Sequence, residues 1–99
     1  MVVEDSEILS KFLNEKTKNE SFSLLIDKYQ QRLYWHIRRM VLNHDDADDL
    51  VQDVFIKVYK NLINFREDAQ LYTWLYRIAT NECITFLNKK KNRNNISID

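Results

Sequence analysis

The 99-residue chain contains no glycine and no proline. These two residues most readily make tight turns, phosphate-cradling loops and strand hairpins, so their absence favours a mostly helical protein. It also excludes Walker and dinucleotide-binding motifs, which need glycine where the backbone approaches a phosphate. A nucleotide-dependent enzyme is therefore not expected, and we expect no cofactor.

Cysteine is nearly absent as well. The single Cys83 excludes an intramolecular disulfide, and its spacing to neighbouring apolar residues predicts a thiol in the core or at its edge. His36 and His44 lie far apart and lack the companion residues of a metal site. No apolar run approaches the ~20 residues that span a bilayer, and the acidic start MVVEDSE is unlike a signal peptide. We therefore expect a cytoplasmic, non-enzymatic protein without membrane insertion.

The charges cancel overall but are unevenly distributed. Residues 1–69 carry ten bases and thirteen acids, whereas residues 70–99 carry five bases and two acids. This division favours two partners of opposite character, because a purely solvated surface more often intersperses its charges. A solvated surface without a partner is the alternative.

Apolar residues recur at helical spacing in four segments. A short lid helix is expected around residues 8–13, a long helix over about 21–43, and a third helix after the polar break at 43–45. Residues 64–70 have no clear period and are expected to form a loop, and a fourth helix begins near Gln70 and ends in a basic cluster. The expected fold is all-α, a compact bundle of about four helices over residues 1–93, followed by a linker or tail at 94–99.

The second helix is apolar on two faces, because Leu24, Trp35 and Leu42 recur opposite its main apolar stripe. A helix of this kind is typical of the centre of a bundle, where neighbours cover both faces. The sequence therefore predicts a central helix, with the first helix lying over Trp35.

The third helix carries an acidic face opposite its core stripe. Ile56 stands there among Asp49, Gln52 and Asp53, and an apolar residue among exposed charges is typical of a modest protein-binding surface. A solvated face, with acids that simply favour the helix N-terminus, is the alternative. The acids do not fit a calcium loop, which requires a central glycine, and no catalytic dyad is recognisable.

The exposed side of the fourth helix is rich in hydroxyls, amides and bases, which bind phosphates and base edges. Nearby aromatic residues offer base stacking, a contact worth about 1–3 kcal/mol per base, so the pattern favours single-stranded nucleic acid. The alternative is that Tyr72 and Trp74 fill the core and the lysines solubilise a helix end. The aromatic residues are Phe65, Tyr72, Trp74 and Tyr76, and the polar ones include Thr73, Arg77, Thr80, Asn81 and Asn88.

Two strings in this order, ADDLVQDVF at 47–55 and YTWLYRIATN at 72–81, followed by lysines, resemble conserved region 2 of bacterial RNA polymerase sigma factors. The extracytoplasmic-function (ECF) group is the most similar, and the resemblance covers about residues 20–93. It implies a transcription initiation factor domain that binds the clamp helices of the largest subunit of core RNA polymerase. By match to the motif, the polymerase contacts would be Asp48, Asp49, Gln52, Asp53 and Ile56.

The resemblance also implies recognition of the promoter minus-ten element and binding of its opened non-template strand. A base-capturing loop would contain Asn64, Phe65 and Arg66, and the strand-opening helix would contribute Tyr72, Thr73, Trp74, Tyr76, Arg77 and Asn81. The basic residues Lys89, Lys90, Lys91 and Arg93 would add phosphate contacts.

Sigma factors of this group normally continue into a second helical domain after a linker, so we expect an N-terminal domain of a longer protein. Many are also held inactive by an anti-sigma factor that covers these surfaces, and the two-faced second helix and Ile56 are compatible with such a partner. Without the resemblance, the alternative is a generic helical interaction module with an acidic binding face and no DNA specificity.

Overall fold

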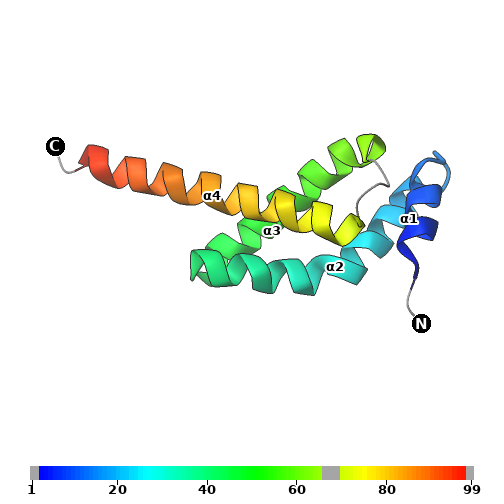
Figure 1. Cartoon of the computed structure of the whole chain (residues 1–99), viewed down its shortest axis with the longest axis horizontal. Coiled ribbons are helices and arrows are strands. Elements are labelled where there is room, and N and C mark those ends of the chain that lie inside the picture. The colour runs from blue at the N-terminus through cyan, green and yellow to red at the C-terminus, as the bar shows by residue number, and fades with distance from the viewer. Residues whose placement is uncertain (1–2, 66–69, 98–99) are drawn as a thin grey trace.

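The structure is a computed structural model that describes residues 3–65 and 70–97, with the backbone alone for residues 93–97. Its elements are α1 (Asp5–Phe12), α2 (Lys18–Val41), α3 (His44–Asn61), the short 3-10 helix η1 (Leu62–Asn64) and α4 (Leu71–Ser97) (Figure 1). These described ranges contain no strand, which confirms the expected all-α bundle of four helices.

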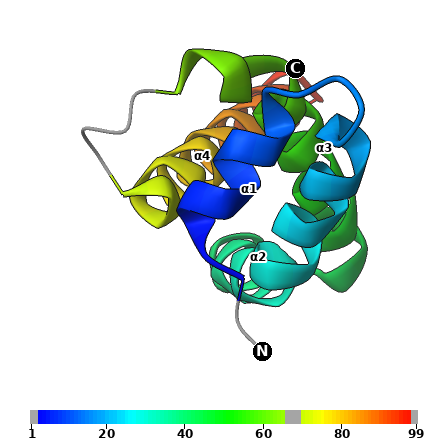
Figure 2. The same cartoon turned by 90° about the vertical axis from the view of Figure 1, so that its right-hand side faces the viewer.

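Helices α2 and α4 run in the same direction, and α3 returns in the opposite direction against both (Figure 1). α1 covers the end of the bundle where α2 and α4 begin and α3 ends (Figure 2). The molecule measures 53 × 26 × 24 Å, because the second half of α4 projects beyond the other helices. None of the helices in the described residues is long and apolar enough to cross a membrane.

The core is built from the apolar stripes that the sequence predicts. Leu33 and Ile37 of α2, Val54 of α3, and Leu75 and Cys83 of α4 are fully buried. The expectation that Cys83 is a core thiol is confirmed, and burial raises the pKa of this thiol to about 11, with the nearby charge of Glu82 adding to the effect.

The α2–α3 connection is formed without glycine. Leu42 ends α2 in the left-handed conformation with φ 63°, and its N–H donates to the Arg38 carbonyl at 3.0 Å. Asn43 then caps α3, because its Oδ1 accepts from the Asp46 N–H at 3.1 Å. The break between the helices therefore falls at residues 42–43, slightly earlier than the expected 43–45, and His44 and Asp45 already belong to α3.

The prediction that α1 lies over Trp35 is wrong. Asp5 of α1 instead accepts hydrogen bonds from Lys28 Nζ at 2.7 Å and from the Tyr29 hydroxyl at 2.7 Å, near the start of α2. Phe12 extends the same contact to α3, with its ring 5.7 Å from that of Tyr59. Trp35 lies farther along α2 and remains 51% exposed. An eight-residue helix of about 12 Å is too short to cover both sites.

The end of α4 also differs from the expectation. The helix continues to Ser97, past the basic cluster at 89–93, into residues that we expected to form a linker or tail. The sequence has neither the glycine nor the proline that commonly ends a helix, so no local signal stops α4 at the basic cluster.

Candidate protein and nucleic-acid interfaces

The acidic face of α3 consists of the five residues that the sequence motif selects. Burial of the α3 apolar stripe in the core turns Asp49, Gln52 and Asp53 outward, and Ile56 is 53% exposed. Asp48 is half-buried, and its Oδ2 lies 3.1 Å from Nε2 of His44. All five predicted residues, Asp48, Asp49, Gln52, Asp53 and Ile56, thus lie along one exposed side of one helix.

An apolar groove of about 480 Å³ runs between α2 and α3 beside the acidic face. Gln52 and Ile56 belong to both features, so the groove and the acidic face form one continuous surface. Sequence reasoning missed the α2 wall of the groove, because Phe22 and Ile26 have the same helical period as fully buried residues. The lining residues are Phe22, Ile26, Gln30, Val51, Gln52, Phe55, Ile56, Tyr59 and Lys60.

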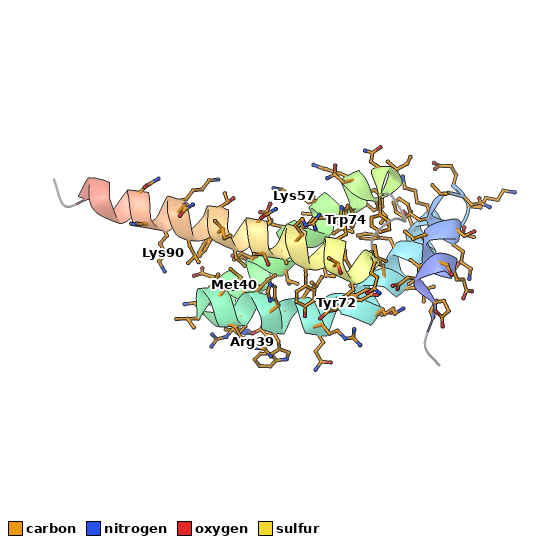
Figure 3. All side chains as sticks on the ribbon, in the orientation of Figure 1. Arg39, Met40, Lys57, Tyr72, Trp74 and Lys90 are labelled. Atoms are coloured by element: carbon orange, nitrogen blue, oxygen red, sulfur yellow. The ribbon has the colours of Figure 1, made fainter. Side chains whose placement is uncertain are left out.

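The predicted nucleic-acid residues of α4 divide between two sides of the helix. Tyr72 faces α2 (Figure 3), and the Arg32 guanidinium lies 5.6 Å from its ring. Tyr76 lies 4.3 Å from Tyr72 between ring centroids and also packs on α2, with its ring 4.5 Å from that of His36. Burial and a hydrogen bond with Tyr72 raise the pKa of Tyr76 above its ordinary value. We call these two tyrosines and Arg32 the tyrosine face; the exposed Thr73, Arg77 and Asn81 lie on the same helix.

Trp74 points to the other side of α4, toward the end of α3 (Figure 3). Its ring lies 5.1 Å from that of Phe65, and it lines a pocket of about 300 Å³ together with Asn64. Lys57 and Asn61 of α3 and Ile78 of α4 form the rest of its lining. We call this site the loop pocket. The sequence motifs do not point to Lys57 or Asn61, because both precede the predicted loop. Arg66, which was predicted to share this loop, lies outside the described residues.

The lysine cluster, Lys89, Lys90 and Lys91, is exposed on the projecting part of α4 (Figure 3). Lys90 is 14 residues beyond Tyr76, or about 21 Å along the helix, so the fold does not place the cluster within the tyrosine face. Lys89 and Lys90 instead border a small pocket with Asp46 and Phe86. The Arg93 side chain lies outside the described part of the structure.

Both histidines have structural partners. His36 lies between α2 and α4, with Nε2 2.8 Å from the Thr80 hydroxyl, and its pKa is lowered by burial and by the charge of Arg39. His44 is exposed and contacts Asp48 and the Tyr34 hydroxyl. Within residues 3–65 and 70–97, no group of three histidine, cysteine or acidic side chains could hold a metal ion.

Comparison with known proteins identifies the family. A family model described as Sigma-70 region 2 matches residues 25–93, which include α3, most of α2 and most of α4. The chain belongs to the sigma-70 region 2 family. The match agrees with the resemblance drawn over residues 20–93 from the two sequence motifs, and family membership confirms the expectation of a non-enzymatic domain.

Several sigma factors are similar to this region 2 domain. RNA polymerase sigma-H factor of Pseudomonas aeruginosa is 45% identical over 67 residues, covering 68% of this chain and 35% of the relative. ECF RNA polymerase sigma factor SigW of Bacillus subtilis is 38% identical, covering 78% and 41%. ECF RNA polymerase sigma-E factor of Escherichia coli is 41% identical, covering 74% and 38%. The matched part is therefore well under half the length of each relative.

A solved structure supports the same assignment for the fold. An engineered region 2 of sigmaE, determined by NMR in complex with GTAAAA, superimposes with a TM-score of 0.80 at 32% sequence identity. The match covers 92% of this chain and 93% of that one. The four-helix arrangement of this chain is thus that of a sigma region 2 domain.

Proposed function

We propose that this sigma region 2 domain binds core RNA polymerase and holds the opened non-template strand of the promoter minus-ten element. The observation that carries the proposal is that one domain of this family presents two different surfaces. The surface on α3 is acidic and adjoins an apolar groove, and the surface on α4 is aromatic and basic. The relatives are named as RNA polymerase sigma factors, and the structural neighbour binds GTAAAA. Such a domain acts in the cytoplasm, where the polymerase works.

The polymerase partner would be the clamp helices of the largest subunit. The acidic face offers Asp49 and Asp53 to basic groups, while Ile56 and the adjoining apolar groove can bury apolar side chains. This arrangement has the composition of a protein interface, in which an apolar centre is surrounded by polar residues. An anti-sigma factor that covered the same groove would compete directly with the polymerase.

The DNA strand would contact both sides of α4. Unstacking a base costs a few kcal/mol and must be offset by stacking, pocket and phosphate contacts. The loop pocket has Trp74 as an aromatic wall and the Asn64 amide as a polar group, which suits capture of one flipped-out base. Tyr72 and Tyr76 offer further aromatic surface, with Arg77 exposed nearby for a phosphate. Binding energy alone can hold the strand open, so no catalytic group is needed.

The experiment that tests the polymerase contact measures the affinity of the domain for bacterial core RNA polymerase. Asp49→Arg plus Asp53→Arg should weaken binding by more than about tenfold, because it places like charges opposite basic groups. The charge-matched control, Glu15→Arg plus Glu20→Arg, changes exposed acids away from the acidic face and should bind like the wild type. Equal affinity of all three proteins would contradict the proposal and favour the generic interaction module.

The DNA contact is tested with single-stranded GTAAAA and a scrambled hexamer of the same composition. The wild type should prefer GTAAAA, and Trp74→Ala should reduce its binding by about 1–3 kcal/mol if one base stacks in the loop pocket. The control is Leu13→Ala, which changes an exposed residue at the end of α1. Binding of both hexamers with equal affinity would contradict promoter recognition by this domain.

A further inference from the structure

A second pocket between α2 and α3 is not explained by the surfaces described so far. It has a volume of about 480 Å³, and its walls include the aromatic residues Tyr34 and Trp35 and the carboxylates of Asp27 and Asp48. Trp35 is 51% exposed, although a side chain of this size is usually highly buried. We call this site the tryptophan pocket.

The aromatic wall of the tryptophan pocket is held in place by a chain of contacts. The Tyr34 ring meets the Trp35 ring edge to face, with centroids 5.2 Å apart and planes at 79°. The Tyr34 hydroxyl is 2.5 Å from Nδ1 of His44, and Nε2 of His44 is 3.1 Å from Asp48. The exposed indole is therefore supported before any partner binds, which lowers the entropic cost of using it for recognition.

The chemistry of the pocket selects a cation. Its lining contains two carboxylates and two aromatic rings but no lysine or arginine, so an anionic or phosphate-bearing ligand is disfavoured. An aromatic face attracts a cation, and a planar guanidinium can stack on the indole while its N–H groups pair with a carboxylate. Among the side chains that the structure describes, Lys18, Lys28 and Arg32 each lie over an aromatic ring. No described lysine or arginine lies over the ring of Trp35.

The tryptophan pocket is continuous with the proposed polymerase interface. Gln30 and Val51 line both this pocket and the apolar groove, and Asp48 belongs to both the pocket and the acidic face. We infer that the tryptophan pocket receives an arginine side chain of the same polymerase segment that binds the acidic face. This inference rests on the proposed function and adds a contact on α2 beyond the family motif of α3.

The affinity for core RNA polymerase tests the inference with variants that leave the acidic face intact. Trp35→Leu keeps an apolar side chain but removes the aromatic face, and should weaken binding about three- to thirtyfold. Trp35→Phe keeps an aromatic face and should bind more tightly than Trp35→Leu. Asp27→Asn removes one carboxylate and should weaken binding and reduce its salt dependence. Leu13→Ala, an exposed apolar residue outside the pocket, should bind like the wild type.

The outcomes separate this inference from the proposed function. If Trp35→Leu and Asp27→Asn bind as tightly as the wild type while the Asp49→Arg plus Asp53→Arg variant does not, the arginine site is overturned and the polymerase interface stands. If Trp35→Leu and Trp35→Phe lose affinity equally, the indole contributes apolar contact only and a guanidinium site is again overturned.

A polymerase-independent measurement covers the case in which the wild type fails to bind and the proposed function is itself overturned. The probe is N-acetyl-arginine amide, titrated against the indole N–H resonance of Trp35 in an NMR spectrum, with N-acetyl-glutamine amide as the uncharged control. A saturable shift with the arginine probe alone, lost in Asp27→Asn, would support a guanidinium site used by a different basic protein. No shift with either probe would overturn the site.

Discussion

His36 shows how a single buried side chain can make the fold sensitive to pH. It joins α2 to α4 through the Thr80 hydroxyl, and its ring lies 4.5 Å from that of Tyr76. Burial and the positive charge of Arg39 lower the pKa of His36 below its ordinary value of 6.5, so the folded state favours the neutral ring. The unfolded chain has no such preference.

The expected result is a loss of stability at acidic pH. Well above 6.5 His36 is neutral in both states. As the pH falls through 6.5 the unfolded chain takes up a proton before the folded state does, so the free energy of unfolding decreases. Urea unfolding at about pH 7.5 and about pH 5.5 should show a larger decrease for the wild type than for His36→Gln. His44→Gln, which changes an exposed histidine, is the control. An identical pH dependence of wild type and His36→Gln would contradict the prediction.

Cys83 should be chemically inert in the folded protein. Its side chain is fully buried and its pKa is raised to about 11, so both access and thiolate formation are suppressed. We expect alkylation by iodoacetamide to be at least about a hundredfold slower than that of a small free thiol, and to rise with urea as the bundle opens. A Cys83→Ala protein carrying Asn92→Cys, which places the thiol at an exposed position, should react quickly. Rapid labelling of native Cys83 would mean that α4 leaves the core readily.

At the scale of the elements, the left-handed conformation of Leu42 destabilises the α2–α3 connection, because the chain has no glycine to place there. A residue with a Cβ in this conformation costs about 1–2 kcal/mol, and glycine avoids most of that cost. Since Leu42 is 76% exposed, replacing it removes little buried surface. Leu42→Gly should therefore raise the free energy of unfolding by about 0.5–1 kcal/mol, whereas Leu42→Ala, which keeps the Cβ, should change it little. Urea unfolding measures the change. If Leu42→Gly lowered the free energy of unfolding, the contacts of the leucine side chain would stabilise the fold by more than its left-handed backbone destabilises it.

The helices could be predicted from the sequence, but the position of the short α1 and the end of α4 could not. α2 and α3 follow from regular spacing and from the Asn43 cap, because these signals are local. The position of α1 depends on a contact between Asp5 and residues more than twenty positions away, which no local pattern encodes. The helical end of α4 does not follow from the sequence, because residues 94–97 carry no apolar period that marks a helix.

The candidate site was predictable in the same partial way. Four residues of the acidic face, Asp49, Gln52, Asp53 and Ile56, follow from the helical period of α3. The family motif adds Asp48. The apolar groove and the loop pocket could not be predicted, because each joins residues from two elements whose relative position is set by packing. Trp74 and Tyr72 illustrate the limit: the helical period places them on opposite sides of α4, but only packing sets their partners, Phe65 for Trp74 and Tyr29 of α2 for Tyr72.

At the scale of the whole molecule, the basic end of α4 stands apart from the surfaces that would recognise bases. The lysine cluster is about 21 Å along the helix from Tyr76, on the part of α4 that projects from the bundle. Phosphate contacts supply affinity and salt dependence, whereas sequence preference comes from contacts with the bases. This separation predicts that the two properties can be changed independently.

Replacing Lys89 and Lys90 by alanine should therefore weaken binding to single-stranded DNA. It should not change the preference for GTAAAA over a scrambled hexamer that the proposed function predicts. If both lysines contact phosphates of a longer strand that carries the hexamer, the slope of log affinity against log salt should flatten by about 0.7–1 unit per lost contact. Lys11→Ala plus Lys16→Ala removes the same charge from the region of α1 and should leave the slope unchanged. An unchanged slope in the Lys89 and Lys90 variant would assign both lysines to solvent. A lost preference for GTAAAA would instead mean that the projecting part of α4 takes part in base recognition.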